Sequence, residues 1–342
     1  MSTPIRTAII GYGRSGQFLH AAGLKGNPDA YEVVAVSSRS QSSRDQAEKD
    51  FGCPTYADYQ LMLRECEIDL VIIVTRNDQH CEMACDVLSA GCHTLVTKPL
   101  GINAAEVEKI YAAADRAGRK MFPYLPARWG TDYRRIQEII DSGEIGQVFA
   151  IHRSAFGFAT RNDWQTQSEF GGGIVLNWGV HLIDPPMLLA GGSPKHLFGA
   201  CQQVLNPGDA EDIFYSIITM DNGTRVHSQW SFSPKGQPDW FVQGSGGCIV
   251  GHGDQLEITT GTPAQPDDPT KFKDMQGDGS QTRTETVGEH LFGDPVEIYH
   301  DVAADLQGQQ PYPVSQEESS RLIAILDGIK QSHQQQTLVP LS

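Results

Sequence analysis

Two side chains in this sequence, Lys98 and His181, have the chemistry to move a proton, and Asn177 has the spacing to orient one of them. The imidazole of His181 titrates near neutrality, and a helix that begins near Ile174 would place Asn177 one turn before it on the same face. Lys98 ends an apolar segment and precedes a proline, which restricts the backbone and favours a defined direction for the ammonium group. The alternatives are that Lys98 only extends to solvent and that His181 is an ordinary hydrogen-bonded residue.

A glycine-rich turn stands at the start of the chain, in I-R-T-A-I-I-G-Y-G-R-S-G. Its glycines have the G-x-G-x-x-G spacing and lie between an apolar strand and a helix predicted over residues 17–24. In a dinucleotide-binding turn such glycines allow a sharp bend, close approach of a pyrophosphate and tight packing of helix on strand, while the helix N-terminus attracts phosphate. We therefore expect the turn to bind a nicotinamide cofactor through Gly11, Tyr12, Gly13, Ser15 and Gly16.

The second apolar segment, residues 31–36, ends in the sequence S-S-R-S. A protein that binds the 2′-hydroxyl of an adenosine ribose normally places an acidic residue here, and this sequence has none. Hydroxyl groups and a guanidinium suit a 2′-phosphate instead. We therefore predict that Ser38 and Arg39 contact the cofactor and that NADP(H) is favoured. NAD(H) is the alternative if Arg39 only begins the next helix.

Apolar and helical segments alternate up to about residue 123, which predicts a doubly wound parallel sheet of the Rossmann type. Ligands of such sheets bind beyond the carboxyl ends of the strands, where the two loops above and segments 75–77 and 97–99 would converge. A change of composition near residues 122–126 marks the boundary between a dinucleotide-binding domain (1–123) and a second domain (124–342). The predicted helices after the first are 43–51, 59–65, 80–90 and 104–117.

The second domain is predicted to be α+β, with a large, open, mostly antiparallel sheet and helices on one face. A second copy of the chain would cover the other face, so we expect a homodimer or homotetramer. Pro185-Pro186 predict the end or a kink of the helix that carries His181. Residues 248–258 are predicted as one strand, and the polar segment 260–288 as an exposed excursion. The other predicted elements are strands 147–158, 197–205, 212–220, 224–232 and 240–242 and helices 131–142, 295–307 and 316–332.

The formal net charge of −16 argues against a nucleic acid or an anionic membrane surface as the main partner. No signal peptide precedes the first strand and no apolar run has the length of a membrane span, so we expect a cytoplasmic protein. Seven cysteines without a C-x-x-C pair fit reduced thiols. Cys81, Cys85 and Cys92 lie close together but lack the partner pair of a zinc site, and we expect no metal.

Four motifs in this order resemble the glucose–fructose oxidoreductase / inositol dehydrogenase (Gfo/Idh/MocA) family. They are G-Y-G-R-S-G near the start, T-R-N-D-Q-H at 75–80, T-K-P at 97–99 and G-G-G-I-V-L-N-W-G-V-H-L-I-D at 171–184. The C-terminal segment from residue 295 to residue 341 is similar as well, so the resemblance covers nearly the whole chain. It implies an NAD(P)-dependent dehydrogenase or reductase of sugars, polyols or their derivatives that forms dimers or tetramers through the sheet.

The resemblance also implies roles for particular residues. Lys98 matches the lysine that binds the reacting oxygen and the nicotinamide ribose, and His181 matches the acid/base histidine. Three positions depart from the family's usual residues: Thr97 replaces Glu, Arg76 replaces Pro and Asn177 replaces Asp. An asparagine can orient an imidazole by hydrogen bonding but adds no negative charge. Thr75, Asn77 and His80 match the loop beside the cofactor, and the candidate substrate residues are Tyr124, Arg128, Asp163, Trp164 and Asp184.

The expected activity is hydride transfer between the nicotinamide and a carbinol or carbonyl carbon of a sugar-like small molecule. In the oxidation direction His181 accepts the hydroxyl proton and Lys98 polarises the developing alkoxide. Two alternatives stay open. One is a glycosidase or epimerase that uses transient oxidation by a tightly held cofactor; the other is a sensor that binds the cofactor without catalysis.

Overall fold

The structure, a computed structural model, describes residues 3–263, 268–272 and 278–341. Its first half is a six-stranded parallel sheet in the order β3-β2-β1-β4-β5-β6, the doubly wound arrangement expected from the sequence. The central strands form because short runs of aliphatic residues can be buried on both faces, and β4 is buried at every position. The strands are β1 Ile5–Ile10, β2 Tyr31–Ser37, β3 Thr55–Tyr56, β4 Leu70–Ile73, β5 His93–Thr97 and β6 Met121–Tyr124.

Helices connect these strands, and short polar side chains begin three of them. Ser40, Asp58 and Asn103 each accept a hydrogen bond from a backbone N–H of the first turn of α2, α3 and α5. The first helical segment departs from the prediction, because a π-helical turn (η1) precedes a short α1. The helical segments are η1 Gly16–His20, α1 Ala21–Lys25, α2 Gln41–Phe51, α3 Tyr59–Glu65, η2 Asn77–Gln79, α4 His80–Ser89 and α5 Ala104–Ala117.

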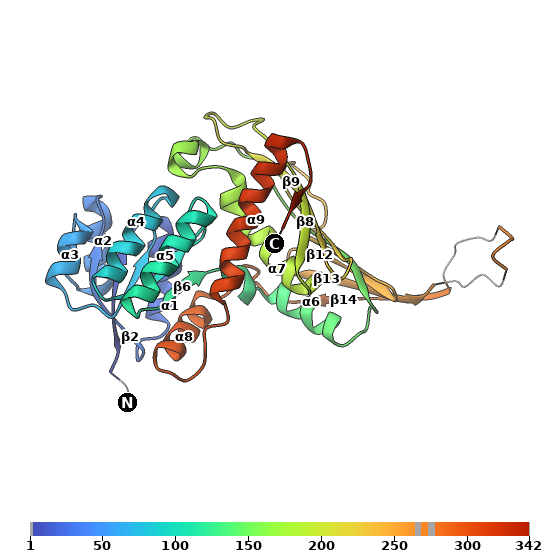
Figure 1. Cartoon of the computed structure of the whole chain (residues 1–342). Coiled ribbons are helices and arrows are strands. Elements are labelled where there is room, and N and C mark those ends of the chain that lie inside the picture. Colours follow the sequence, from blue (N-terminus) through green and yellow to red (C-terminus); the bar gives the residue numbers. More distant parts are fainter. Residues whose placement is uncertain (1–2, 264–267, 273–277, 342) are drawn as a thin grey trace.

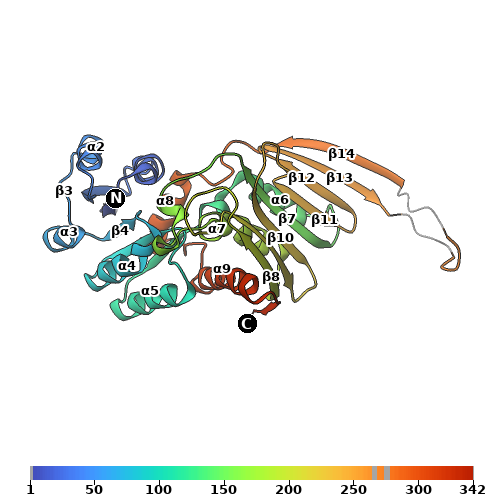
Figure 2. The same cartoon turned by 90° about the horizontal axis from the view of Figure 1, so that it is seen from above.

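The second half is built on a nine-stranded sheet in the order β14-β13-β12-β11-β7-β10-β9-β8-β15 (Figure 2). Its neighbouring strands are antiparallel except for β7 and β10, which run parallel. The strands are β7 Val148–Gly157, β8 Pro194–Gln202, β9 Ile213–Met220, β10 Arg225–Phe232, β11 Trp240–Gly244, β12 Gly247–His252, β13 Gln255–Thr262, β14 Asp278–Thr286 and β15 Val339–Pro340.

Two predictions for this sheet are wrong. Residues 248–258 do not form one strand, because Gly253, with φ of +57°, turns the chain and creates the hairpin β12–β13. The segment 260–288 is not only an excursion, since it completes β13 and supplies β14. Its polar residues suit β14 because this strand is the edge of the sheet. Residues 264–267 and 273–277 of the segment lie outside the described part of the chain.

Helices α7 and α9 lie between the two sheets (Figures 1 and 2), so one face of the large sheet is covered. The other face carries Phe198, Tyr215 and Ile217, each about two-fifths exposed. Helix α8 packs against α1, where Tyr299 Oη lies 2.7 Å from Nδ1 of the buried His20. No helix in the described ranges is long and apolar enough to span a membrane. The helical segments of this half are η3 Pro126–Trp129, α6 Thr131–Asp141, η4 Trp164–Thr166, η5 Ser168–Phe170, α7 Ile174–Ala190, α8 Pro295–Leu306 and α9 Gln316–Gln335.

The prolines inside α7 do not end the helix, which was one of the two outcomes predicted for them. Pro186 has no N–H to donate to the carbonyl of Leu182, four residues earlier. Ser228 of β10 supplies that hydrogen bond instead, with Oγ donating to Leu182 O at 2.7 Å. A neighbouring strand therefore satisfies a carbonyl that the proline leaves free, and the helix continues to Ala190.

Candidate active site

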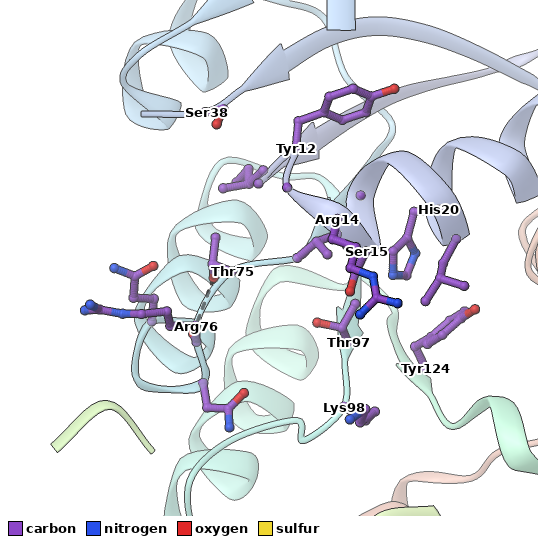
Figure 3. Close-up of a pocket in the computed structure, with 18 of the residues that line it drawn as sticks. Tyr12, Arg14, Ser15, His20, Ser38, Thr75, Arg76, Thr97, Lys98 and Tyr124 are labelled. Carbon is purple, nitrogen blue, oxygen red and sulfur yellow. Dashed lines mark hydrogen bonds between the residues drawn. The ribbon is translucent and has the colours of Figure 1, made fainter. Parts of the chain in front are cut away.

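A cavity of about 1050 Å³ lies between the two halves of the molecule. One wall consists of the loops that follow β1, β2, β4 and β5, which are the four loops expected to converge. The opposite wall comes from α7, from residues 161–165 and from the loop before α8. Figure 3 shows Ser38 toward one end of this cavity, Arg14 and Ser15 near its middle, and Lys98 toward the other end.

The three glycines of the first turn have different surroundings. A Cβ on Gly11, with φ of +96°, would lie 2.2 Å from the carbonyl oxygen of Val74, and one on Gly16 would lie 2.6 Å from the carbonyl oxygen of Gly11. A Cβ on Gly13 would meet nothing within 4 Å, because this residue faces the open cavity. Gly11 and Gly16 therefore serve close backbone packing, while Gly13 leaves the space that a pyrophosphate needs. The turn fits a dinucleotide.

The loop after β2 has the polar character that the sequence indicated. Ser38, Arg39, Ser40 and Ser43 line the cavity, and Arg39 is exposed. Arg44 supports this loop from α2: Nη1 donates to the carbonyl oxygens of Ser38 at 2.6 Å and of Arg39 at 3.0 Å. The backbone that presents Ser38 and Arg39 is thus held by a second guanidinium.

Tyr12 differs from its neighbours in the turn, because its side chain is wholly buried. Its hydroxyl donates to Asp50 Oδ2 at 2.7 Å, and burial raises the pKa of this hydroxyl. The side chain of Tyr12 therefore belongs to the core, and this residue offers mainly its backbone to the cavity.

Lys98 lies at the other end of the cavity, beyond β5. Its Nζ donates to both the backbone oxygen and Oδ1 of Asn177, each at 2.8 Å. Asn177 Nδ2 in turn donates to Gln165 Oε1 at 2.8 Å, and this bond turns the amide oxygen of Asn177 toward the lysine. Burial, with a smaller effect of Arg161, lowers the pKa of Lys98 to about 8.

His181 lies one turn after Asn177 on α7 and lines the same cavity. Its ring packs against the rings of Trp178 and Phe292, with centroids 5.8 and 5.5 Å away. Within the described residues, no protein group hydrogen-bonds this ring. Burial, followed by the charges of Lys98 and Arg153, holds the pKa of His181 well below its ordinary value. His181 is therefore a neutral imidazole at neutral pH and can accept a proton.

The loop after β4 joins the two halves. Thr75, Arg76 and Asn77 line the cavity, and Asn77 Nδ2 donates to the carbonyl of Gly171 at 2.7 Å. Arg76, in place of the family's usual proline, forms an ion pair with Asp78 and stacks on a phenylalanine of η5 with 4.0 Å to the ring centroid.

His80 is fully buried and is not part of the cavity wall. Its ring nitrogens lie 2.7 Å from the carbonyl oxygen of Pro99 and 3.2 Å from that of Thr75. His80 therefore connects the loop after β4 to the loop that carries Lys98, which is a positioning role and not the cofactor contact that we predicted.

The predicted substrate residues separate into two groups. Tyr124 and Trp164 line the cavity. Arg128 and Asp184 do not: they form a buried ion pair, with Nε–Oδ2 and Nη2–Oδ1 distances of 2.8 Å. The assignment of this pair to the substrate is therefore corrected, because both groups are buried off the cavity wall and Arg128 is held by Asp184 and, at 3.0 Å, by Glu318 Oε2. Asp163 also lies off the cavity wall, where it begins η4 and pairs with Arg161.

Several residues of the cavity wall were not foreseen from the sequence. Arg14 lies within the glycine motif and Gln165 follows Trp164, so proximity to recognised residues was an available signal for both. Phe292 and Pro295 lie more than a hundred residues beyond His181, and no local pattern marks them. Among the described residues, no three His, Cys, Asp or Glu side chains gather in a way that could hold a metal ion.

Comparisons with known proteins agree with this geometry. A family model described as "Oxidoreductase family, NAD-binding Rossmann fold" matches residues 5–125, and one described as "GFO/IDH/MocA C-terminal domain" matches residues 133–250. The chain is 27% identical to the oxidoreductase YdgJ of Escherichia coli, over 99% of both chains. It is 23% identical to scyllo-inositol 2-dehydrogenase (NADP(+)) IolW of Bacillus subtilis, over 98% of this chain and 96% of that one.

The fold is also found in solved structures. The crystal structure of an NAD-binding protein from Listeria innocua superposes with a TM-score of 0.84 at 24% identity, over 98% of this chain and 96% of that one. Both halves of the chain match, in order, the two domains that the family models describe. The chain therefore belongs to the Gfo/Idh/MocA family of NAD-binding oxidoreductases.

Proposed function

We propose that this protein is a dehydrogenase that transfers a hydride between a nicotinamide and a hydroxyl-bearing carbon of a sugar or polyol. The observation that carries the proposal is the composition of one cavity: the glycine turn lies at one part of its wall, and Lys98 and His181 lie at another. The nicotinamide supplies the hydride acceptor or donor. The protein side chains must then bind the substrate hydroxyl and move its proton.

The two titratable groups have complementary charge states for this task. His181 is neutral at neutral pH because of burial and nearby cations, so in the oxidation direction it accepts the hydroxyl proton. Lys98, with a pKa of about 8, is about nine-tenths charged at pH 7 and stabilises the negative charge that develops on the substrate oxygen. In the reduction direction, protonated His181 returns the proton. Asn177 positions Lys98 without competing for the proton, because an amide oxygen is neutral.

The residues after β2 support NADP(H) as the preferred cofactor. Arg39 is exposed beside Ser38 and Ser40 on the cavity wall, where a 2′-phosphate would gain charge-assisted hydrogen bonds. Among the described residues of that wall, Asp58 is the acidic side chain that could accept a hydrogen bond from a ribose hydroxyl. Its carboxylate already accepts a hydrogen bond from the first turn of α3. Arg39→Ala should weaken NADP(H) binding about tenfold or more and leave NAD(H) binding nearly unchanged, as measured by quenching of intrinsic fluorescence. An equal loss for both cofactors contradicts this preference.

The open face of the large sheet supports a homo-oligomer. Phe198 of β8 pairs with Ile217 of β9, Tyr215 lies on the same face two residues before Ile217, and all three side chains stay partly exposed. A second copy of the same face would remove this apolar surface from water. Sedimentation of the purified chain should therefore show a dimer or tetramer, and an Ile217→Lys variant should shift it toward the monomer.

Turnover of a panel of sugars and polyols with both cofactors tests the main proposal. Lys98→Ala and His181→Ala should each lower kcat by about a hundredfold or more while cofactor binding stays largely intact. Undiminished turnover in either variant removes that residue from the mechanism. Product formation without net change in cofactor absorbance indicates the glycosidase or epimerase alternative, and cofactor binding without turnover indicates the sensor.

A further inference from the structure

The charge of the cavity wall is opposite to the charge of the protein. The chain carries a formal net charge of −16. Among the described residues that line the cavity, however, there is one carboxylate, Asp58, and there are five lysine or arginine side chains: Arg14, Arg39, Arg76, Lys98 and Arg161. A wall with one predominant sign of charge raises the local concentration of ligands of the opposite sign.

The dinucleotide accounts for only part of this positive charge. Arg14 belongs to the glycine turn and Arg39 to the loop after β2, so both lie where phosphates of a dinucleotide bind. Arg76 forms an ion pair with Asp78, and its guanidinium also stacks on a phenylalanine of η5. Arg161 differs from all of these, because it comes from the second half of the chain, three residues before Trp164.

The ion pair with Asp163 uses only part of the N–H donors of Arg161. Its Nε and Nη2 donate to Asp163 Oδ2, at 3.2 and 2.9 Å. A guanidinium has five N–H donors, so the end formed by Nη1 and Nη2 keeps the two donors that a second carboxylate needs. Asp163 itself lies off the cavity wall, while Arg161 lies on it. The pair with Asp163 therefore orients the guanidinium and leaves its free end for a ligand.

In the described part of the chain, no carboxylate of the cavity wall pairs with Lys98 or His181. The hydrogen-bond acceptors that the described residues offer to Lys98 are neutral oxygens of Asn177. The charge of Arg161 reaches this ammonium group, since it contributes to the lowered pKa of Lys98. The charges that act on His181 are those of the cations Lys98 and Arg153. An anionic group on the ligand would relieve this repulsion.

We infer that the substrate is a sugar or polyol acid, whose carboxylate is bound by the free Nη1/Nη2 end of Arg161 while its hydroxyl reacts at Lys98 and His181. The inference rests on the proposed dehydrogenase function and adds the substrate class. The carboxylate takes no part in the reaction; it contributes binding and neutralises the site. Trp164, beside Arg161 on the wall, offers an apolar face to the carbon skeleton.

The test compares substrates that differ only in the acid group. D-glucose with D-glucuronate, D-galactose with D-galacturonate, and D-glucitol with D-gluconate form the pairs, and glucose 6-phosphate is the phosphate-bearing probe. Each is measured for kcat/KM with the wild-type holoenzyme, and for binding by calorimetry. We expect at least one acid to exceed its neutral counterpart about tenfold or more in both measurements.

Variants of the arginine and its partner should act in opposite directions. Arg161→Gln should lower the ratio of kcat/KM for each acid to kcat/KM for its neutral counterpart by about tenfold or more. Asp163→Asn, which can still begin η4, should increase acid binding several-fold because the competing carboxylate is gone. Arg119→Gln, which precedes the amino end of β6 and lies off the cavity wall, is the matched control and should behave like wild type.

Calorimetry separates failure of this inference from failure of the proposed function. Acid preference in binding without turnover supports the substrate class and contradicts the dehydrogenase. Turnover of neutral substrates with equal or better kcat/KM than every acid overturns the inference and keeps the dehydrogenase. A preference for glucose 6-phosphate over all carboxylates, or an acid preference that survives Arg161→Gln, also overturns it.

Discussion

Replacing Asn177 by aspartate tests whether Lys98 titrates during turnover. Lys98 Nζ donates to Asn177 Oδ1 at 2.8 Å, and burial lowers the pKa of this ammonium group to about 8. Asn177→Asp places a negative charge at that oxygen with almost no change in side-chain size. Because the charged form of Lys98 gains an opposite charge, its pKa must rise.

The expected size of the shift follows from the same contact. Two unit charges that are 2.8 Å apart attract by about 6 kcal/mol at an effective dielectric constant of about 20. Burial of the new carboxylate offsets much of this energy, and the amide of Gln165 must turn so that it donates to the carboxylate instead of accepting. A carboxylate beside a cation typically shifts a pKa by about 1–3 units, so we expect the pKa of Lys98 to rise by roughly 2 units.

The assay is the pH dependence of kcat/KM for substrate oxidation. Lys98 is charged below its pKa, so activity of the wild type should fall as pH rises through about 8. Asn177→Asp should move this fall upward by roughly 2 pH units. Asn177→Leu, which has similar size and no acceptor, is the matched control and should move it downward. Reductive methylation of Lys98, followed by mass spectrometry, reports the same titration without turnover.

An unmoved basic limb in Asn177→Asp, together with an unmoved methylation profile, would refute the reasoning. Lys98 would then be a fixed charge and not a titrating group in this pH range. A shift of the methylation profile without a shift of the activity profile would show that Lys98 titrates but that its charge does not limit turnover.

The remaining predictions concern cofactor binding and stability. Gly13→Ala should keep the melting temperature and weaken cofactor binding, because its Cβ would meet no protein atom within 4 Å. Gly11→Ala should lower the melting temperature, because its Cβ would lie 2.2 Å from a backbone oxygen. Arg128→Met should cost about 3–5 kcal/mol in denaturant unfolding, because it leaves Asp184 buried without its partner; a change in KM with unchanged stability would restore the pair to the substrate site. Burial lowers the pKa of His20 to about 3. Its contribution to stability is complete above the unfolded pKa of about 6.5 and is lost as pH falls toward 3, and about 2 kcal/mol of it is already lost at pH 5. His20→Gln should remove that part of the pH dependence, and identical slopes for both proteins would contradict it.

The chemistry at the strand ends was predictable because it is local. The glycine spacing, the serine- and arginine-rich end of β2 and the lysine after β5 each lie within a few residues of an apolar strand, and parallel strands bring their carboxyl ends to one edge. Tyr12 and His80 show the limit of this reasoning. Both lie within recognised motifs, yet burial turns one into a core residue and the other into a connector between two loops.

The partners of charged groups were not predictable. Arg128 and Asp184 are 56 residues apart, and nothing in their neighbourhoods indicates that they meet as a buried pair. The same is true of Gln165, which meets Asn177 across a loop, and of Phe292, which reaches the ring of His181 from the loop before α8. Such contacts depend on how α7 packs with η3, with η4 and with the loop before α8.

The sequence by itself determined the alternation of strands and helices, the dinucleotide turn and the two candidate proton-carrying groups. Each of these follows from residue type and short-range spacing, which act through backbone sterics and local burial. Only the tertiary structure decided which charges stay available in the cavity. Lys98 has neutral acceptors and a lowered pKa, Arg128 is neutralised in the core, and Arg161 keeps a free end beside the reactive groups. Charge availability depends on burial and on distant partners, and both arise only when the two halves pack against each other.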